Sequence, residues 1–182
     1  MVLPSTFVLY ATYRYGWDEK TVGLTLAMVG ICAMAVQGAA IGPIVTRFGE
    51  RRALLFGLCC GAVGFFIFGA APSGPLFWLG IPVMALWGIA SAATQGLMSR
   101  LVAPDQQGAL QGATTSVQSL SQLVGPFLFT LTFAYFIGGN VPWVMPGAPF
   151  LLASGLLVLA LLIAMRVLAG MTMSARASPS LN

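Results

Sequence analysis

Long runs without a charged residue alternate with short polar segments along the whole chain. Three such runs cover Thr21–Thr46, Ala53–Ser99 and Gln106–Met165, with 26, 47 and 60 residues respectively. A helix that spans the hydrocarbon core of a bilayer needs about 20 apolar residues. The first run therefore has the length of one spanning helix, and each of the two longer runs has room for two.

Proline and glycine divide the two longer runs. Ala71-Pro72-Ser73-Gly74-Pro75 interrupts one of them and Gly138-Gly139-Asn140-Val141-Pro142 the other, and both combinations are typical of turns. Strands of a membrane β-barrel would be about ten residues long with alternating polarity, whereas these runs are uniformly apolar. The pattern predicts five full helices, over residues 21–45, 53–71, 75–99, 107–137 and 147–166.

The first segment, Val2–Tyr13, is shorter than the others. Its 12 residues would form about 18 Å of helix, against a hydrocarbon core about 30 Å thick. Arg14 follows the apolar run instead of preceding it, which argues against a secretory signal peptide. We interpret this segment as part of a spanning helix whose beginning lies elsewhere. The predicted fold is an all-α, polytopic transmembrane bundle over residues 1–170, followed by a disordered tail at 171–182.

Composition supports a location in the bilayer. Apolar residues make up 58% of the chain and charged residues 7%, and the mean hydropathy is +0.93, whereas soluble domains carry roughly 25% charged residues. The few cations form no dense basic patch of the kind that binds nucleic acid. The chain has no histidine, and the adjacent Cys59 and Cys60 lack metal-ligand spacing. We expect no cofactor, no metal site and no enzyme activity, since no nucleophile–base pair is evident.

Lysine and arginine gather on one side of the predicted bundle. That side receives six of them, namely Arg47, Arg51, Arg52, Arg100, Arg166 and Arg176. The other side receives Arg14 and Lys20 only. The positive-inside rule places the side with six cations, and with it the C-terminus, in the cytoplasm. Trp17, Trp78 and Trp143 then fall at the outer boundary, as in an interfacial aromatic belt.

A polar stripe runs along the helix predicted over residues 107–137. Thr114, Gln118 and Gln122 recur every four residues, which places them on one helix face. A polar face in a spanning helix is expected to meet protein or a water-filled cavity. We interpret the stripe as lining a substrate pathway, and the alternative is hydrogen bonding that holds helices together.

Other residues inside the predicted spans have two possible roles. Gln37 and Gln95 are further candidates for the pathway. Trp87 lies nine residues from Trp78, about 13.5 Å into the membrane, where it forms either a pocket wall or a packing contact. Glycines in the second full helix are interpreted as a helix-packing surface; they are Gly57, Gly61 and Gly64.

The loop between the first two full helices has a distinct pattern of glycine and arginine. Glycines allow two helix ends to approach closely, and arginines can pair with acids or with helix C-termini. We interpret the loop as a gating element, and the alternative is a positive-inside anchor. The residues assigned to it are Gly42, Arg47, Gly49, Arg51 and Arg52.

This loop resembles the G-x-x-x-D-R-x-G-R-R signature of the major facilitator superfamily, with Thr46 at the usual aspartate position. Three further segments agree, and they are Arg14-Tyr-Gly-Trp-Asp18, Gln107-Gly-Ala-Leu-Gln-Gly112 and Gly125-Pro126. Their order resembles the second half of the tetracycline efflux antiporters of that superfamily, over essentially residues 1–170. Two departures concern the substrate: tetracycline pumps carry an aspartate where this chain has Gly61, and they tend to carry a histidine in the preceding helix.

The resemblance implies one six-helix half of a two-bundle transporter with its substrate site between the halves. The implied function is export of a small amphipathic drug, tetracycline-like or other, in exchange for a proton across a bacterial inner membrane. The implied partner is a missing N-terminal six-helix half. All four acids of this chain lie in loops or at helix ends, so we expect the proton carrier in that half. The alternative is a truncated, non-transporting fragment, or a packing subunit without activity of its own.

Overall fold

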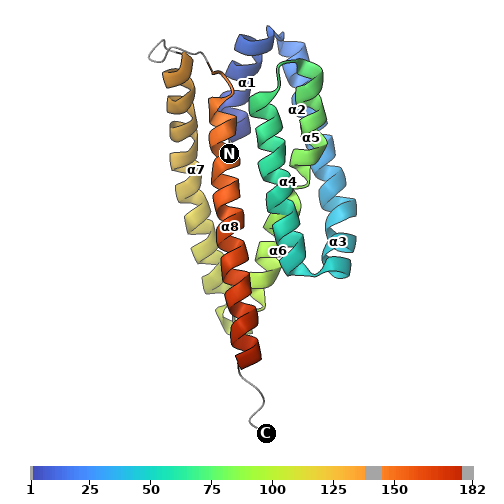
Figure 1. The fold of residues 1–182 in the computed structure, drawn as a ribbon, viewed down its shortest axis with the longest axis vertical. Helices are drawn as coiled ribbons and strands as arrows, with labels where there is room; N and C mark the ends of the chain where they lie inside the picture. Colours follow the sequence, from blue (N-terminus) through green and yellow to red (C-terminus); the bar gives the residue numbers. More distant parts are fainter. Residues whose placement is uncertain (1, 138–144, 178–182) are drawn as a thin grey trace.

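The computed structural model describes residues 2–137 and 145–177, and within these ranges most of the chain is helical (Figure 1). The helices are α1 (Val2–Tyr15), α2 (Glu19–Ala35), α3 (Ile41–Phe48), α4 (Glu50–Ala70), α5 (Gly74–Ala85), α6 (Gly88–Ser99), α7 (Gln107–Ile137) and α8 (Ala148–Ala177). A π-helical turn, Val36–Ala40, joins α2 to α3, and a short 3-10 turn, Pro104–Gln106, precedes α7. The long helices lie side by side, so that the loops gather at the two ends of the bundle.

Within the described residues, five helical segments are long and apolar enough to cross a membrane, which confirms the predicted number. They are Glu19–Phe48, Glu50–Ala70, Gly74–Ser99, Pro104–Ile137 and Ala148–Gly170. α1, with 14 residues, is a short helix as predicted. α8 continues to Ala177, so residues 171–177 are helical where a disordered tail was predicted. The predicted turn at 138–142, Trp143 and residues 178–182 lie outside the described residues.

Two of the spans are interrupted where a single regular helix was predicted. In the first, the N–H of Ile41 donates to the carbonyl of Val36, five residues back. Pro43 follows this π-helical turn, and a proline cannot donate to, and clashes with, the carbonyl four residues before it. In the third span, Pro82 lies inside α5. The helix ends at Ala85 and α6 starts at Gly88, which leaves Trp87 at the break.

The glycines of α4 form the surface that packs against α5 and α6. A Cβ atom built on Gly57 would lie 2.5 Å from the backbone nitrogen of Ala90, and one built on Gly64 would lie 2.7 Å from the Cβ of Met84. A Cβ atom built on Gly61 would likewise lie too close to the side chain of Trp87, at 2.8 Å from its Cδ1. The absence of side chains therefore lets the two spans approach closely, which confirms the interpretation of these glycines as a packing surface.

α4 also packs along α8, and a buried hydrogen bond joins the two helices. The Ser154 hydroxyl on α8 donates to the carbonyl of Ala62 on α4 at 2.8 Å. At the end of this helix pair, the backbone at Gly147 lies against the backbone carbonyl of Gly69. Neither glycine has room for a side chain between the two segments. α4 is therefore the central helix of the described bundle, with α5 and α6 on one flank and α8 on another.

Replacing Ser154 with alanine is expected to lower the free energy of unfolding by about 1 kcal/mol, because hydrogen bonds between membrane helices average about 0.6 kcal/mol and reach about 1.7. Ser116→Ala is the matched control, since the Ser116 hydroxyl donates within its own helix to the carbonyl of Gly112. Unfolding of both variants by sodium dodecyl sulfate, followed by circular dichroism, measures the difference. Equal midpoints would contradict the role given to Ser154.

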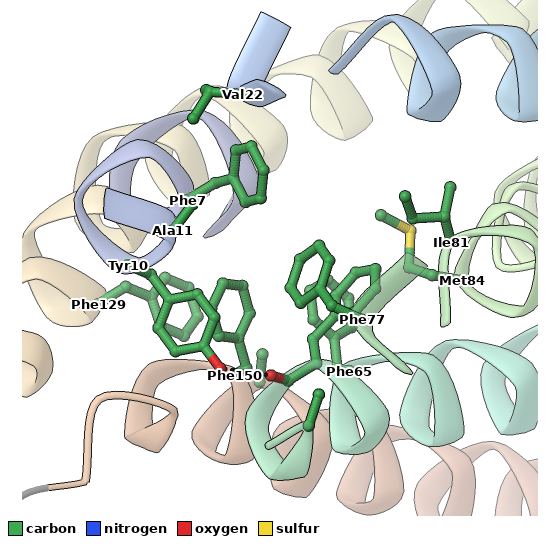
Figure 2. Packing of buried hydrophobic residues seen from close by; sticks show 13 residues of the cluster. Phe7, Tyr10, Ala11, Val22, Phe65, Phe77, Ile81, Met84, Phe129 and Phe150 are labelled. Carbon is green, nitrogen blue, oxygen red and sulfur yellow. Dashed lines mark hydrogen bonds between the residues drawn. The ribbon is translucent and has the colours of Figure 1, made fainter. Parts of the chain in front are cut away.

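Aromatic side chains fill the end of the bundle where α1 lies (Figure 2). Tyr10 is fully buried and donates a hydrogen bond of 3.0 Å to the carbonyl of Phe68. The ring of Phe68 stacks on that of Phe77 with 4.2 Å between centroids, and Phe150 meets Tyr10 edge-on at 4.9 Å. Tyr15 donates to the carbonyl of Ala71, the C-cap of α4, at 2.8 Å. The short first helix is thus anchored to α4 and α8.

The two described tryptophans at this end belong to the same aromatic packing. Trp17 and Trp78 lie 5.8 Å apart between ring centroids, and the indole N–H of Trp78 donates to the hydroxyl of Thr25 at 3.1 Å. Asp18, which follows Trp17 in the chain, is the N-cap of α2 and accepts a hydrogen bond from the N–H of Thr21 at 3.0 Å. Hydrogen bonds from Thr21 hold the pKa of Asp18 below its ordinary value, so this acid stays charged as a helix cap at neutral pH.

Candidate functional site

The predicted gating loop forms a sharp corner between α3 and α4. Gly49 ends the first helix and begins the second with φ of +78°, a conformation that L side chains rarely adopt. The Thr46 hydroxyl, at the position of the usual aspartate, donates to the carbonyl of Gly42 at 3.0 Å. The side chains of Arg47, Arg51 and Arg52 are exposed at this corner, and Gly42 has open space around it.

An ion pair ties this corner to the end of α6. Oε1 of Glu50 lies 3.0 Å from a guanidinium nitrogen of Arg100. The Glu50 side chain is 13% exposed, and its carboxylate fills the space beside Gly96, where an added Cβ would lie 2.7 Å from Oε1. Because Arg100 is 77% exposed, the pair contributes at most about 1 kcal/mol to stability. Its main effect is to fix the start of α4 against the end of α6.

Sequence reasoning missed this pair, although a signal was present. Glu50 begins one predicted span and Arg100 ends the next, so the two residues had to lie on the same side of the membrane. The small residue at Gly96, one turn before Arg100, marks where another side chain could approach the helix.

Two predicted pathway residues, Gln95 and Thr114, meet at a small hollow between α6 and α7. The hollow has a volume of about 20 Å³, which is room for about one water molecule and not for a drug. The Thr114 hydroxyl is occupied by a hydrogen bond of 2.8 Å to the carbonyl of Leu110 in its own helix. The complete lining is Gln95, Met98, Ser99, Gln107, Leu110, Gln111 and Thr114.

The other predicted pathway residues lie apart from this hollow. Gln118 and Gln122 are exposed on α7, and no hydrogen bond links either side chain to the residues that the structure describes. Gln37 is exposed in the π-helical turn. The described part of this chain therefore does not use these amides to join its own helices.

Trp87 packs against α4 at the break between α5 and α6. A Cβ on Gly61 would lie 2.8 Å from Cδ1 of the indole, and the ring meets Phe65 edge-on with 5.7 Å between centroids. The side chain keeps 38% of its surface exposed. Trp87 thus occupies the space beside Gly61, which gives a physical reason for the small residue there.

The exposed surfaces are unevenly distributed among the spans. In α4 and in the α5–α6 span, 39% of the most apolar 18-residue window is buried, against 6% in the α2–α3 span and 11% in α7. On α7, the exposed face carries the amides of Gln118 and Gln122, which lipid tails cannot satisfy. These features define a multi-span helical membrane protein in which the polar face of α7 is left exposed by the other described helices.

Comparison with known proteins identifies the family. The family model for the Major Facilitator Superfamily matches residues 1–181. The class G tetracycline resistance protein of Vibrio anguillarum is 37% identical over 141 residues, which cover 76% of this chain and 35% of that protein. The class E protein of Escherichia coli is 32% identical over 162 residues, covering 88% and 39%. The human Hippocampus abundant transcript-like protein 1 is 29% identical over 175 residues, covering 88% and 35%.

This chain belongs to the Major Facilitator Superfamily, a family of membrane transporters and not of enzymes. The chain spans between one third and two fifths of the length of these curated relatives. The resemblance drawn from the loop and from the QGALQG segment is thereby confirmed at the level of the family.

Proposed function

We propose that this chain supplies the C-terminal half of a proton-coupled efflux antiporter that exports a small amphipathic drug. The observation that carries the proposal is the 32–37% identity to tetracycline resistance proteins of classes G, C, E and B. The poorly covered polar face of α7 is compatible with it. In such an assembly, this face borders the substrate pathway between the two halves.

The proton carrier is assigned to the partner half. Proton coupling requires a titratable group inside the membrane. In this chain, Asp18 caps α2, Glu50 pairs with Arg100, and Glu19 and Asp105 lie in the first turns of helical segments. With no histidine in the chain, none of its groups is suited to carry a proton across the apolar interior.

The proposed substrate is either a tetracycline-like drug or another small amphiphile. The relatives named for tetracycline resistance favour the former. The Gly61–Trp87 contact favours the latter, since an indole fills the place beside the helix position where tetracycline pumps are expected to carry an acid. A drug bound between the halves would meet an apolar indole there in place of a carboxylate.

The proposed location is the inner membrane of a bacterium, with the C-terminus and the corner at Glu50 in the cytoplasm. In a variant without native cysteines, a cysteine at position 18 is expected to react with an impermeant thiol reagent in intact cells, and one at position 50 only after the membrane is opened. The reason is the cation distribution of six against two. Labelling at position 50 but not at position 18 in intact cells would contradict this orientation and support the opposite one.

Co-expression tests the function itself. The chain is produced in a drug-susceptible bacterium together with the N-terminal half of the class G relative, and tetracycline and several other amphiphiles are tried. We expect resistance to at least one of them with both halves present, and none with either half alone. No resistance to any of these compounds with both halves present, although the halves co-purify, would favour the packing-subunit alternative.

A further inference from the structure

A groove lies where the beginning of α4, the end of α6 and the last span, α8, meet. It is at the end of the bundle opposite the aromatic cluster. Its volume is about 650 Å³, within the range of sites that hold small organic molecules. None of the predicted pathway residues lines it. The wall is apolar, with Leu54, Leu97, Leu101, Ala164 and Val167 among its residues.

The rim of the groove is basic. Arg51, Arg52 and Arg100 line it together with Glu50, so its lining carries a net charge of +2. Glu50 is already engaged by Arg100 at 3.0 Å, and Arg51 and Arg52 are exposed beside it. The first turn of α4 adds the positive end of a 21-residue helix at the same place.

We propose that this groove binds one anionic phospholipid. The phosphate and headgroup would lie against Arg51, Arg52 and the start of α4. The parts of the acyl chains nearest the headgroup would lie against the apolar wall. The charge of the rim selects this occupant, because a basic rim above an apolar wall at one membrane surface matches a negative headgroup joined to hydrocarbon. A zwitterionic lipid would use the wall but gain little from the rim, and a free anion would use only the rim.

Native mass spectrometry of the purified 182-residue chain tests the proposal. The chain is mixed with equal amounts of phosphatidylglycerol and phosphatidylcholine of the same acyl composition, and the ratio of the two bound species is measured. We expect phosphatidylglycerol to be preferred, and Arg51→Gln combined with Arg52→Gln to reduce that preference about tenfold. The matched control, Lys20→Gln with Arg47→Gln, removes the same charge outside the groove lining and should keep the preference.

A second pair of variants tests the groove without changing charge. Val167 lines the groove and is 56% exposed, so Val167→Trp should obstruct it without disturbing the packed core. Val158→Trp, at a residue of α8 that is 43% exposed and outside the groove, is the control. We expect the first variant to lose the preference for phosphatidylglycerol and the second to keep it, with equal helicity by circular dichroism.

Three results would overturn the proposal. If Val167→Trp keeps the preference, the arginines attract lipid only as a charged surface. If glycerol 3-phosphate at millimolar concentration displaces the lipid, the site recognises an anion and not a phospholipid. If the two lipids bind the wild-type chain equally, the groove holds ordinary boundary lipid. None of these outcomes depends on drug transport, so the lipid site and the proposed function can fail separately.

Discussion

Replacing Gly57 with alanine is expected to destabilise the chain by about 1–3 kcal/mol, while the same replacement at Gly30 stabilises it by up to about 1 kcal/mol. At Gly57 the new Cβ would lie 2.5 Å from the backbone nitrogen of Ala90 and 2.8 Å from its Cβ. Because backbone atoms cannot move aside as a flexible side chain can, α4 and α6 would have to separate. At Gly30, on α2, nothing lies within 4 Å of the new atom.

Unfolding in sodium dodecyl sulfate, followed by circular dichroism, gives the two free-energy changes on the same scale. The comparison is internally controlled, since both residues lie inside apolar helices and both variants add one methyl group. A Gly57→Ala variant as stable as the wild-type chain would show that the close approach of α4 and α6 is not part of the folded state.

Gln118→Leu and Gln122→Leu are expected to weaken drug binding by about 5–30-fold in the assembled transporter, the scale of one lost hydrogen bond of 1–2 kcal/mol. Neither amide bonds to a described residue of this chain, and both are exposed on α7. Their partners in an assembly are therefore the other half, cavity water or the drug. For the same reason, the folded yield of the chain produced alone should stay unchanged in both variants.

The measurement combines expression level and drug affinity on the same preparations of both halves. Gln106→Leu is the control, because Gln106 is exposed in the 3-10 turn before α7 and lies outside the predicted pathway. If the assembled complex loses yield but keeps its relative affinity for several drugs, Gln118 and Gln122 serve assembly and not the pathway.

The spans could be predicted from the sequence because their signal is long and uniform. Charge-free runs and Pro/Gly turns place most ends of the five spans to within a few residues, as at Ala71–Gly74. The exception is the end of α8, which was predicted at residue 166 and lies at Ala177. The breaks at Val36–Ala40 and at Leu86–Trp87 could not be predicted from hydropathy, since both lie inside apolar runs. Pro43 and Pro82 were the available signals, but a proline in a membrane helix can also be accommodated without a break.

The candidate site was less accessible to sequence reasoning. The regular spacing of Thr114, Gln118 and Gln122 gives a shared helix face, but spacing alone does not say what that face meets. The Glu50–Arg100 pair and the groove beside it arise from three helices that are distant in sequence. Their contact depends on how closely α4 packs on α6 and α8, which small residues such as Gly57, Gly96 and Ser154 allow.

Drug flux in membrane vesicles with an imposed pH gradient tests most directly whether this chain is one half of a proton-coupled transporter. Tetracycline movement is followed in vesicles that contain the chain alone and in vesicles that contain it with the N-terminal half of the class G relative. We predict no gradient-dependent flux from the chain alone, because its four acids lie in loops or at the ends of its spans and it has no histidine. With both halves present, we predict flux that collapses with the gradient. Gradient-dependent flux from the chain alone would contradict the account.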